Sequence, residues 1–430
     1  MSSSELVMAC LRRIGERDGH HSADGDEGSI NAWVRVYAED ARAAAAIADV
    51  RLAQPDPPPL CGVPVGLKDL YAVAGKPLTA SSRLLDEVPI ADCDVWRNLK
   101  NAGMVLLGHT HTHEFAAGGT TDQVGNPWAL ERSAGGSSGG SGAALAAGLV
   151  PAATGTDTAG SLRIPAALCG VSTIKPTRGL VSMNGVVPLA QSLDHGGPMA
   201  RSVADCAAML AAMTNLPGIS RRDGTRPLDG VRVAISPRVA AVSLDDDVRD
   251  GLEVAVSACR ELGATVLDAS TPPTGEADVA HLKVLCTDML AFHRKFEDRR
   301  GEYRASTREF LEMGERFAIS SGQYEVLQDE RRVTTGRWQR WLEAERIDVL
   351  LEPTVPVTAP LRGKGYDHAG NDADLVSLTY FWDWTGFPVV SLPAGVGRRS
   401  QLPVGVSLVG TTGADAGVLA ISIALQEILR

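Results

Sequence analysis

A lysine and several serines in glycine-lined turns are the residues of this sequence whose types suit nucleophilic catalysis. Residues 154–165 read TGTDTAGSLRIP, and Ser161 directly follows Ala159 and Gly160 there. Successive backbone N–H groups in such a turn can form an oxyanion hole beside a serine hydroxyl. Lys68 ends the apolar run GVPVGLK. Desolvation lowers the pKa of a buried lysine, so that its amine can act as a base. The alternative is a structural lysine paired with Asp69, although neighbours on a strand point to opposite faces.

The Gly/Ser-rich run at residues 135–142, GGSSGGSG, permits four interpretations. It resembles a flexible linker, or an anion-binding turn before a helix, but no Walker lysine follows it. It also resembles a nucleophile elbow, because Ser137 and Ser138 each satisfy G-x-S-x-G. An elbow needs an apolar strand before the serine, and we expect no strand over residues 130–134, LERSA. The fourth interpretation, which we favour, is that a serine of this run forms one catalytic site together with Lys68 and Ser161.

Alternating histidines raise the question of a metal site. His109, His111 and His113 would present three imidazoles on one face if they lay on one strand, which would suit zinc. The alternative is that they are polar residues lining a site or lying at the surface. No carboxylate or cysteine with clear ligand spacing completes the set, so we expect no metal.

Two further patterns suggest other sites. Ser172 and Lys175 fit the S-x-x-K motif of β-lactamases, but that motif needs a helix and Lys175 precedes a proline, which disfavours one. We therefore reject this interpretation. Trp382, Trp384 and Phe387 either line an apolar substrate pocket or pack in the core, and the sequence does not decide between the two.

The elements that must position these residues follow from periodicity and turn composition. We expect helices over residues 4–17, 37–52, 95–102, 143–149 and 417–429, and strands over 60–70, 104–107, 231–235, 349–351, 389–392 and 404–408. Residues 116–142 have loop composition. Alternation of strands and helices predicts the α/β class. Lys68 would then end a strand, while the serines would lie in turns.

Composition excludes several classes of protein. The chain has 430 residues, of which 41 are basic and 52 acidic, giving a formal charge of −11. The acidic balance argues against sequence-independent nucleic-acid binding and against binding to an anionic membrane. Seven cysteines without a C-x-x-C pair indicate reduced thiols in a cytoplasmic protein. No apolar stretch approaches 18 residues and no secretory signal is evident, so no membrane span is expected.

Long motifs of this sequence resemble the amidase signature family. The resemblance covers nearly the whole chain, and its main motif is GGSSGGSGAALAAGLVPAATGTDTAGSLRIPAALCG at 135–170. The other motifs are GVPVGLKDL (62–70), GHTHTHEFAAG (108–118), IKPTRGLVS (174–182), PLAQSLDHGGPMARSVADC (188–206), LLEPTVPVTAP (350–360), WTGFPVVSLPAG (384–395) and LPVGVSLVG (402–410).

The resemblance implies a fold and a domain organisation. The fold is a large, mixed, twisted central β-sheet covered by α-helices on both faces. We expect one domain over 1–430, with an N-terminal helical segment at 1–59, a signature core at 60–206 and a helical cap or side layer at 245–345.

The resemblance also implies the roles of the site residues. Ser161 would be the nucleophile, Ser137 the bridging serine and Lys68 the base, and the spacing of 24 residues between the two serines agrees. Backbone N–H groups of Thr158, Ala159 and Gly160 would form the oxyanion hole. The chain departs from the family at Ala159, where glycine is common, at His111, where asparagine is common, and at Asp383, where asparagine often stands. We expect Asp157 and Arg163 to form a structural ion pair.

The implied function is hydrolysis of an amide-type carbon–nitrogen bond through an acyl-enzyme, without a cofactor. The expected substrate is a small amide, aryl amide or carbamate (as in a urethanase), with no nucleic acid and no membrane as partner, and a homodimer is left open. One alternative is a subunit of a glutamine-dependent tRNA amidotransferase. Others are an esterase of the α/β-hydrolase type and a catalytically silent scaffold.

Overall fold

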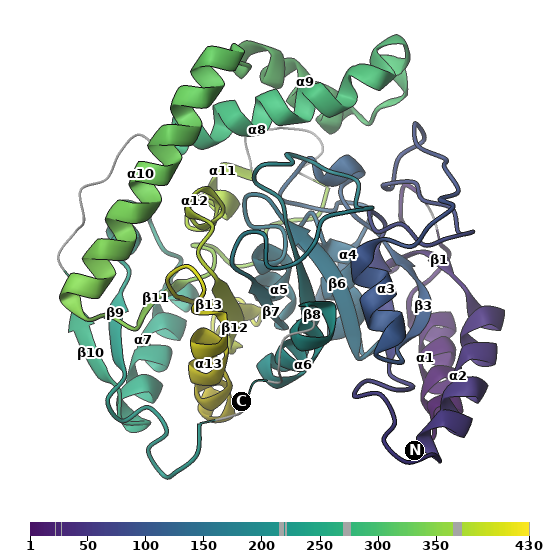
Figure 1. The fold of residues 1–430 in the computed structure, drawn as a ribbon, viewed down its shortest axis with the longest axis horizontal. Coiled ribbons are helices and arrows are strands. Elements are labelled where there is room, and N and C mark those ends of the chain that lie inside the picture. Colours follow the sequence, from purple (N-terminus) through teal and green to yellow (C-terminus); the bar gives the residue numbers. More distant parts are fainter. Residues whose placement is uncertain are drawn as a thin grey trace.

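One large β-sheet forms the centre of the protein (Figure 1). The computed structural model describes residues 1–21, 23–26, 28–214, 219, 222–269, 277–363 and 372–429. The eleven strands of the sheet lie in the order β1 (Trp33–Val36), β3 (Val105–Thr110), β2 (Pro64–Lys68), β6 (Ala152–Asp157), β8 (His195–Ala200), β7 (Ser172–Lys175), β12 (Val389–Val396), β13 (Pro403–Val409), β11 (Val349–Pro353), β9 (Arg232–Ile235) and β10 (Thr265–Asp268). The sheet is mixed: β2 pairs in parallel with β3 and β6, whereas β8 pairs antiparallel with β6 and β7.

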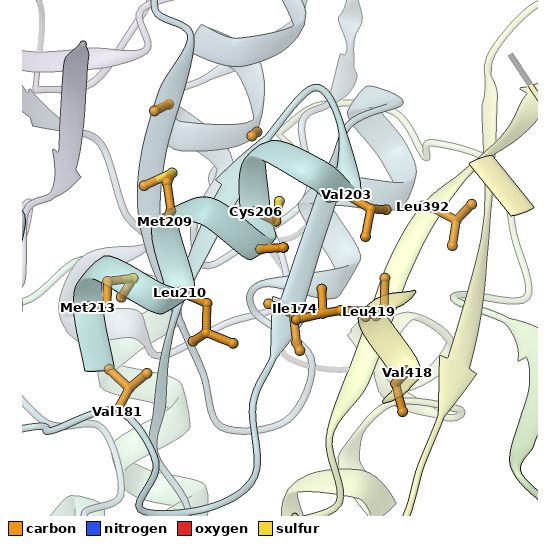
Figure 2. Close-up of a cluster of buried hydrophobic side chains, with 14 of the residues drawn as sticks. Ile174, Val181, Val203, Cys206, Met209, Leu210, Met213, Leu392, Val418 and Leu419 are labelled. Carbon is orange, nitrogen blue, oxygen red and sulfur yellow. The ribbon is translucent and has the colours of Figure 1, made fainter. Parts of the chain in front are cut away.

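Helices cover both faces of this sheet. One face carries α3 (Asp94–Asn101), α6 (Val203–Thr214), α7 (Asp246–Glu261) and α13 (Asp415–Leu429). The other face carries α1 (Ser3–Arg17), α2 (Ala38–Leu52), α4 (Gly139–Ala146) and α5 (Arg163–Cys169). Figure 2 shows the core of the first face, where Cys206 and Leu210 of α6 lie near Ile174 of β7 and Leu419 of α13. The predicted α/β fold with a mixed sheet is therefore confirmed.

A third group of helices arches over one end of the sheet. It contains α8 (Ala277–His293), α9 (Ala305–Phe317) and the long α10 (Ser321–Glu345) (Figure 1). Helices α8 and α10 contact α12 (Tyr380–Thr385), and α9 packs on α8. Short helices complete the fold: η1 (Glu114–Ala116), η2 (Pro237–Ala241), η3 (Arg294–Glu302) and α11 (Asp372–Val376). Within the predicted helical layer at 245–345, α7 lies on the sheet while α8 to α10 lie beyond it. Residues 270–276 of that layer lie outside the described part of the chain. The organisation as one domain remains a prediction.

One prediction about secondary structure is wrong. Residues Ala129–Ser133 form a strand, β5, where none was expected, and β5 pairs with β4 (Gly125–Asn126) in a separate two-stranded sheet. The strand was missed because it is polar and partly exposed, so it lacks the apolar run of a buried strand. The other expected elements are present with small shifts of their ends.

The cysteines and the helix lengths bear on two predictions made from composition. The seven cysteines are free thiols, and six of them are buried. No helix in the described ranges is long and apolar enough to cross a membrane.

Candidate active site

The buried end of β2 presents the side chain of Lys68 to three hydroxyl groups. Its Nζ lies 2.7 Å from Ser137 Oγ, 2.9 Å from Ser138 Oγ and 2.8 Å from Thr156 Oγ1. The lysine is fully buried, and this desolvation lowers the pKa of its amine to about 7, although Asp157 and Asp194 partly oppose the shift. Within the described ranges no carboxylate lies within ion-pair distance of Nζ. The lysine is therefore poised to exchange a proton near neutral pH.

The suggested pairing of Lys68 with Asp69 is not what the structure shows. The carboxylate of Asp69 accepts hydrogen bonds from the hydroxyl of Thr79 and from the backbone N–H of Ser81. Since β2 ends at Lys68, the two neighbouring side chains are directed to different surroundings. The suggested ion pair between Lys68 and Asp69 is therefore absent from the described structure.

The hydrogen bonds of Ser137 and Ser138 distinguish their roles. Ser138 Oγ donates to the carbonyl of Thr156 at 3.3 Å and accepts from the N–H of Thr156 at 3.3 Å, besides its contact with Lys68. Its hydroxyl is therefore fully used in fixing β6 next to the lysine. Ser137 Oγ has Lys68 as its one hydrogen-bond partner in the described structure. A hydroxyl has one donor and two acceptor positions, so Ser137 can still bond to a further group.

The glycine-rich run is a close-packed turn and not a linker. Residues 135–142 are all buried, and α4 begins within the run at Gly139. A Cβ at Gly136 would lie 2.1 Å from the carbonyl oxygen of Thr120, and one at Gly140 would lie 2.5 Å from the N atom of His111. Only glycine permits these approaches, and they bring Ser137 against the end of β2.

The turn after β6 carries Ser161 and is held by a buried ion-pair network. Asp157 accepts from the N–H of Gly160 at 2.5 Å and from that of Leu162 at 3.2 Å. Its carboxylate also pairs with Arg163 at 2.8 Å, and Arg163 pairs with Asp383 at 2.5 Å. The expected structural ion pair of Asp157 and Arg163 is confirmed. Asp383, where the family often has asparagine, adds a second negative charge to it.

Ser161 lies where the two turns are in contact, and it lines a cavity. The N–H of Ser138 donates to the carbonyl of Ser161 at 3.3 Å, so the serine-bearing turns are in direct contact. Ser161 is 6% exposed and lines a cavity of about 970 Å³. Lys68, Ser137 and Ser161 are thus brought to one place, with the lysine and Ser137 inside and Ser161 at the cavity wall.

The predicted oxyanion hole is partly engaged by the protein itself. The N–H of Gly160 donates to Asp157, which makes it a structural donor in this conformation. Thr158 is fixed from two sides: its hydroxyl donates to Asp194 at 2.6 Å, and His281 Nε2 lies 3.0 Å from its carbonyl oxygen. The assignment of Thr158 and Ala159 as oxyanion donors remains a prediction.

The sequence did not indicate Thr156, Asp194 or His281 as residues of this site. Thr154 and Thr156 alternate on β6 and face Lys68, since Thr154 Oγ1 accepts from the lysine backbone N–H at 3.1 Å. The alternation of the two threonines in TGTD could have indicated that they share one face of a strand. Asp194 and His281 come from distant segments, and nothing in their local sequence indicates the contact.

The three alternating histidines do not lie on one strand. Strand β3 ends at Thr110, so His109 alone lies within it. The His109 nitrogens lie 2.8 Å from the hydroxyl of Tyr37 and 3.0 Å from the carbonyl of Tyr71. His113 Nδ1 lies 3.0 Å from the carbonyl of Thr120. The rings therefore turn to different partners, and the described residues hold no cluster of ligands that suits a metal ion.

We expect a chelator such as EDTA to leave unchanged the amide hydrolysis that the sequence predicts. The ring nitrogens just described are occupied by hydrogen bonds within the protein, so they are not free as ligands. The measurement is the rate before and after prolonged dialysis against EDTA, together with elemental analysis of the protein. Stoichiometric zinc together with loss of rate on chelation would contradict this expectation.

Aromatic residues divide between the cavity and the core. Tyr380, Phe381 and Trp338 line the cavity, which also contacts the small residues at 116–119. Trp382, Trp384 and Phe387 do not line it and pack in the same buried cluster as those three, which decides the question that the sequence left open. The cavity wall therefore contains both aromatic and small residues.

Asp157→Ala should strongly destabilise the protein. The change removes the carboxylate that holds the Ser161 turn and leaves the buried guanidinium of Arg163 with Asp383 alone. Breaking a buried ion pair by removing one partner costs about 3–5 kcal/mol. The measurement is the free energy of unfolding in urea. Asp229→Ala is the control, because this exposed residue pairs with exposed Arg226, and its effect should stay below about 0.5 kcal/mol. Equal effects of the two changes would contradict the structural role of Asp157.

Comparison with known proteins assigns this fold and site to a family. A family model described as Amidase matches residues 20–419. The chain therefore belongs to the amidase family. It is 34% identical to a subunit of the glutamyl-tRNA(Gln) amidotransferase of Ralstonia nicotianae, over 99% of this chain and 94% of that protein.

Solved structures agree with this assignment. A structure described as an amidase superposes with a TM-score of 0.86 at 29% identity, covering 99% of this chain and 96% of that one. The structure of 6-aminohexanoate cyclic dimer hydrolase superposes with a TM-score of 0.84 at 28% identity, covering 100% of this chain and 94% of that one. The expected family and its fold are confirmed.

Proposed function

We propose that the protein hydrolyses a carbon–nitrogen bond of a small amide, aryl amide or carbamate through an acyl-enzyme on Ser161. The observation that carries the proposal is the fully buried Lys68, whose amine contacts Ser137 at 2.7 Å beside the Ser161 turn. Membership of the amidase family supports the reaction class. The cavity at Ser161, with aromatic and small residues in its wall, supports an apolar or aryl substituent on the substrate.

The proposed reaction begins with proton transfer toward Lys68. A neutral amine has two N–H groups and one lone pair, so it can donate to Ser138 and Thr156 while accepting from Ser137. Ser137 in turn accepts the proton of Ser161. The described residues show no direct hydrogen bond between the hydroxyls of Ser137 and Ser161, so the relay requires the two hydroxyls to turn toward one another, which is a rotation about each Cα–Cβ bond.

Ser161 Oγ then attacks the carbonyl carbon of the substrate and forms a tetrahedral oxyanion. The backbone N–H groups of Thr158 and Ala159 are the proposed donors to this oxyanion, and Gly160 would join them only by leaving Asp157. The proton returns through Ser137 to the leaving amine. Water then attacks the acyl-enzyme by the same relay and releases the acid. No cofactor takes part in the proposed scheme.

A second candidate function is that of one component of an amidotransferase complex. The similarity to the glutamyl-tRNA(Gln) amidotransferase component covers nearly the full length of both proteins. In that role the same serine would hydrolyse glutamine, and the chain would work with partner subunits. The net charge of −11 weighs against a direct contact with tRNA by this chain.

One experiment separates the two candidates. The purified chain is assayed against p-nitroanilides, primary amides, carbamates and glutamine, and in parallel it is purified from its native host to reveal associated subunits. Turnover of an amide or carbamate by the isolated chain supports the main proposal. Turnover of glutamine alone, dependent on a copurified partner, would replace the main proposal with the amidotransferase function.

A further inference from the structure

A single arginine lines the cavity that contains Ser161. Arg238 lies in η2, directly after β9. Its guanidinium carbon is 4.5 Å from the ring centre of Phe381 and 5.0 Å from that of Tyr380. One of its terminal nitrogens, Nη2, donates to the carbonyl of Ser377 at 2.8 Å. Its Nε is buried and makes no hydrogen bond within the described residues.

Arg238 is the one lysine or arginine among the residues that line this cavity in the described structure. No carboxylate of the described chain lies within 4.0 Å of its guanidinium to form an ion pair. Asp278 also lines the cavity, but it is exposed at the rim and accepts the hydroxyl of Tyr380. The two lining histidines, His113 and His281, have their pKa lowered to about 4 by burial, so they are neutral at pH 7.

Hydrogen bonds connect Arg238 to the turn that carries Ser161. Ser377 accepts from Arg238, and Thr379 donates from its hydroxyl to the carbonyl of Ala159. Since Arg238 and Ser161 line the same cavity, a substrate that occupies it could place its carbonyl at Ser161 and a second group at the guanidinium.

We propose that Arg238 binds a carboxylate of the substrate, so that the preferred substrates are amides with an anionic carboxylate a short spacer away from the scissile bond. This inference rests on the proposed amide hydrolysis and names its substrate class. A guanidinium has five N–H donors in a planar fork that matches a carboxylate. The hydrogen bond to Ser377 engages one of the nitrogens, and the side chain of Tyr380 also interacts with the guanidinium. The rings of Tyr380 and Phe381 lie against the half-buried guanidinium and shield it in part from water, which strengthens a charge-assisted hydrogen bond.

The test compares two matched pairs of substrates that differ by one charge. The first pair is the mono-p-nitroanilide of glutaric acid and its methyl ester, which place the carboxylate on the acyl side. The second pair is N-butyryl-4-aminobenzoate and its methyl ester, which place it on the amine side. We expect wild type to prefer the acid in one pair by about 10- to 100-fold in kcat/KM, the factor of one or two hydrogen bonds to a charged group. Equal rates for acid and ester in both pairs would overturn the inference.

Variants of the arginine show whether the preference arises at this residue. Arg238→Gln should lose most of the preference for the acid, with a much smaller loss for the ester, and Arg238→Lys should restore only part of it because it lacks the fork. Arg226→Gln is the matched control, because this exposed arginine lies outside the cavity and pairs with Asp229. An equal loss for acid and ester in Arg238→Gln would show a structural role and overturn the inference.

A binding experiment distinguishes failure of the proposed amide hydrolysis from failure of the proposed carboxylate site. If wild type hydrolyses none of the four compounds, calorimetric binding of each acid and ester to Ser161→Ala still tests the arginine. Tighter binding of one acid, lost on adding Arg238→Gln, supports the carboxylate site without the reaction. Equal affinity for acid and ester in both pairs overturns it.

Discussion

Ser161→Ala is expected to lower kcat by about 10⁴-fold or more, the loss seen when a covalent nucleophile of a serine enzyme is removed. The remaining site would still hold the substrate and the oxyanion donors, but it would form no acyl-enzyme. The protein should stay folded, because the hydrogen bonds that hold this turn come from Asp157 and from the backbone. The measurement is kcat on the best substrate of the hydrolysis panel, with circular dichroism to verify the fold.

Two controls make this result specific. Ser257→Ala removes an exposed serine hydroxyl on α7 and should leave kcat unchanged. A fluorophosphonate should label wild type on Ser161, as determined by peptide mapping. An adduct on Ser137 or Ser138, or near-normal turnover by a folded Ser161→Ala protein, would disprove the assignment of the nucleophile.

Lys68→Ala should lower kcat/KM by about 10²- to 10⁴-fold, the usual contribution of a positioned general base. Burial lowers the pKa of this lysine to about 7. A base must be deprotonated to accept a proton, so the wild-type kcat/KM should rise with pH through about 7 and level off on the alkaline side. Below pH 7 the ammonium form prevails and the rate should fall about tenfold per pH unit. Lys68→Arg should not restore the rate, because a guanidinium does not deprotonate in this range.

A second buried lysine provides the control for the pH profile. Lys175 of β7 is also fully buried, and burial lowers its pKa to about 7, but its Nζ contacts the carbonyl of Pro176 and no serine. Lys175→Met should therefore leave the midpoint of the profile unchanged. Full activity of Lys68→Arg with an unchanged pH profile would show that Lys68 is a structural cation and would disprove the proposed relay.

The local structure around the proposed catalytic residues was predictable because its constraints are local. The apolar run before Lys68 indicated a buried strand ending in an amine, and β2 ends there. The small residues around Ser161 indicated a tight turn, and Asp157 and Arg163 are close enough in sequence to suggest their ion pair. The α/β class followed from alternating apolar runs and helical segments.

The surroundings of the core were not predictable, because they depend on contacts between distant segments. His281 of α8 reaches the carbonyl of Thr158, and Asp383 reaches Arg163 across 220 positions of sequence. The engagement of the Gly160 N–H by Asp157 depends on the conformation of the turn, which composition does not specify. Polar β5 was missed because its pairing partner, and not its own pattern, makes it a strand.

The origin of the cavity wall in the chain affects how the substrate specificity of such a protein can evolve. The proposed reacting side chains come from residues 68–161. Much of the wall of the adjoining cavity comes from η2, α8, α9 and α12, which follow β8 in the chain. Substitutions in these later segments can therefore alter the shape and charge of the cavity while the contacts of Lys68 with Ser137, Ser138 and Thr156 stay intact. The proposed relay would then persist while the specificity changes in gradual steps. For design, exchanging η2 and α8 between relatives is a route to new substrates that leaves the surroundings of Lys68 unchanged.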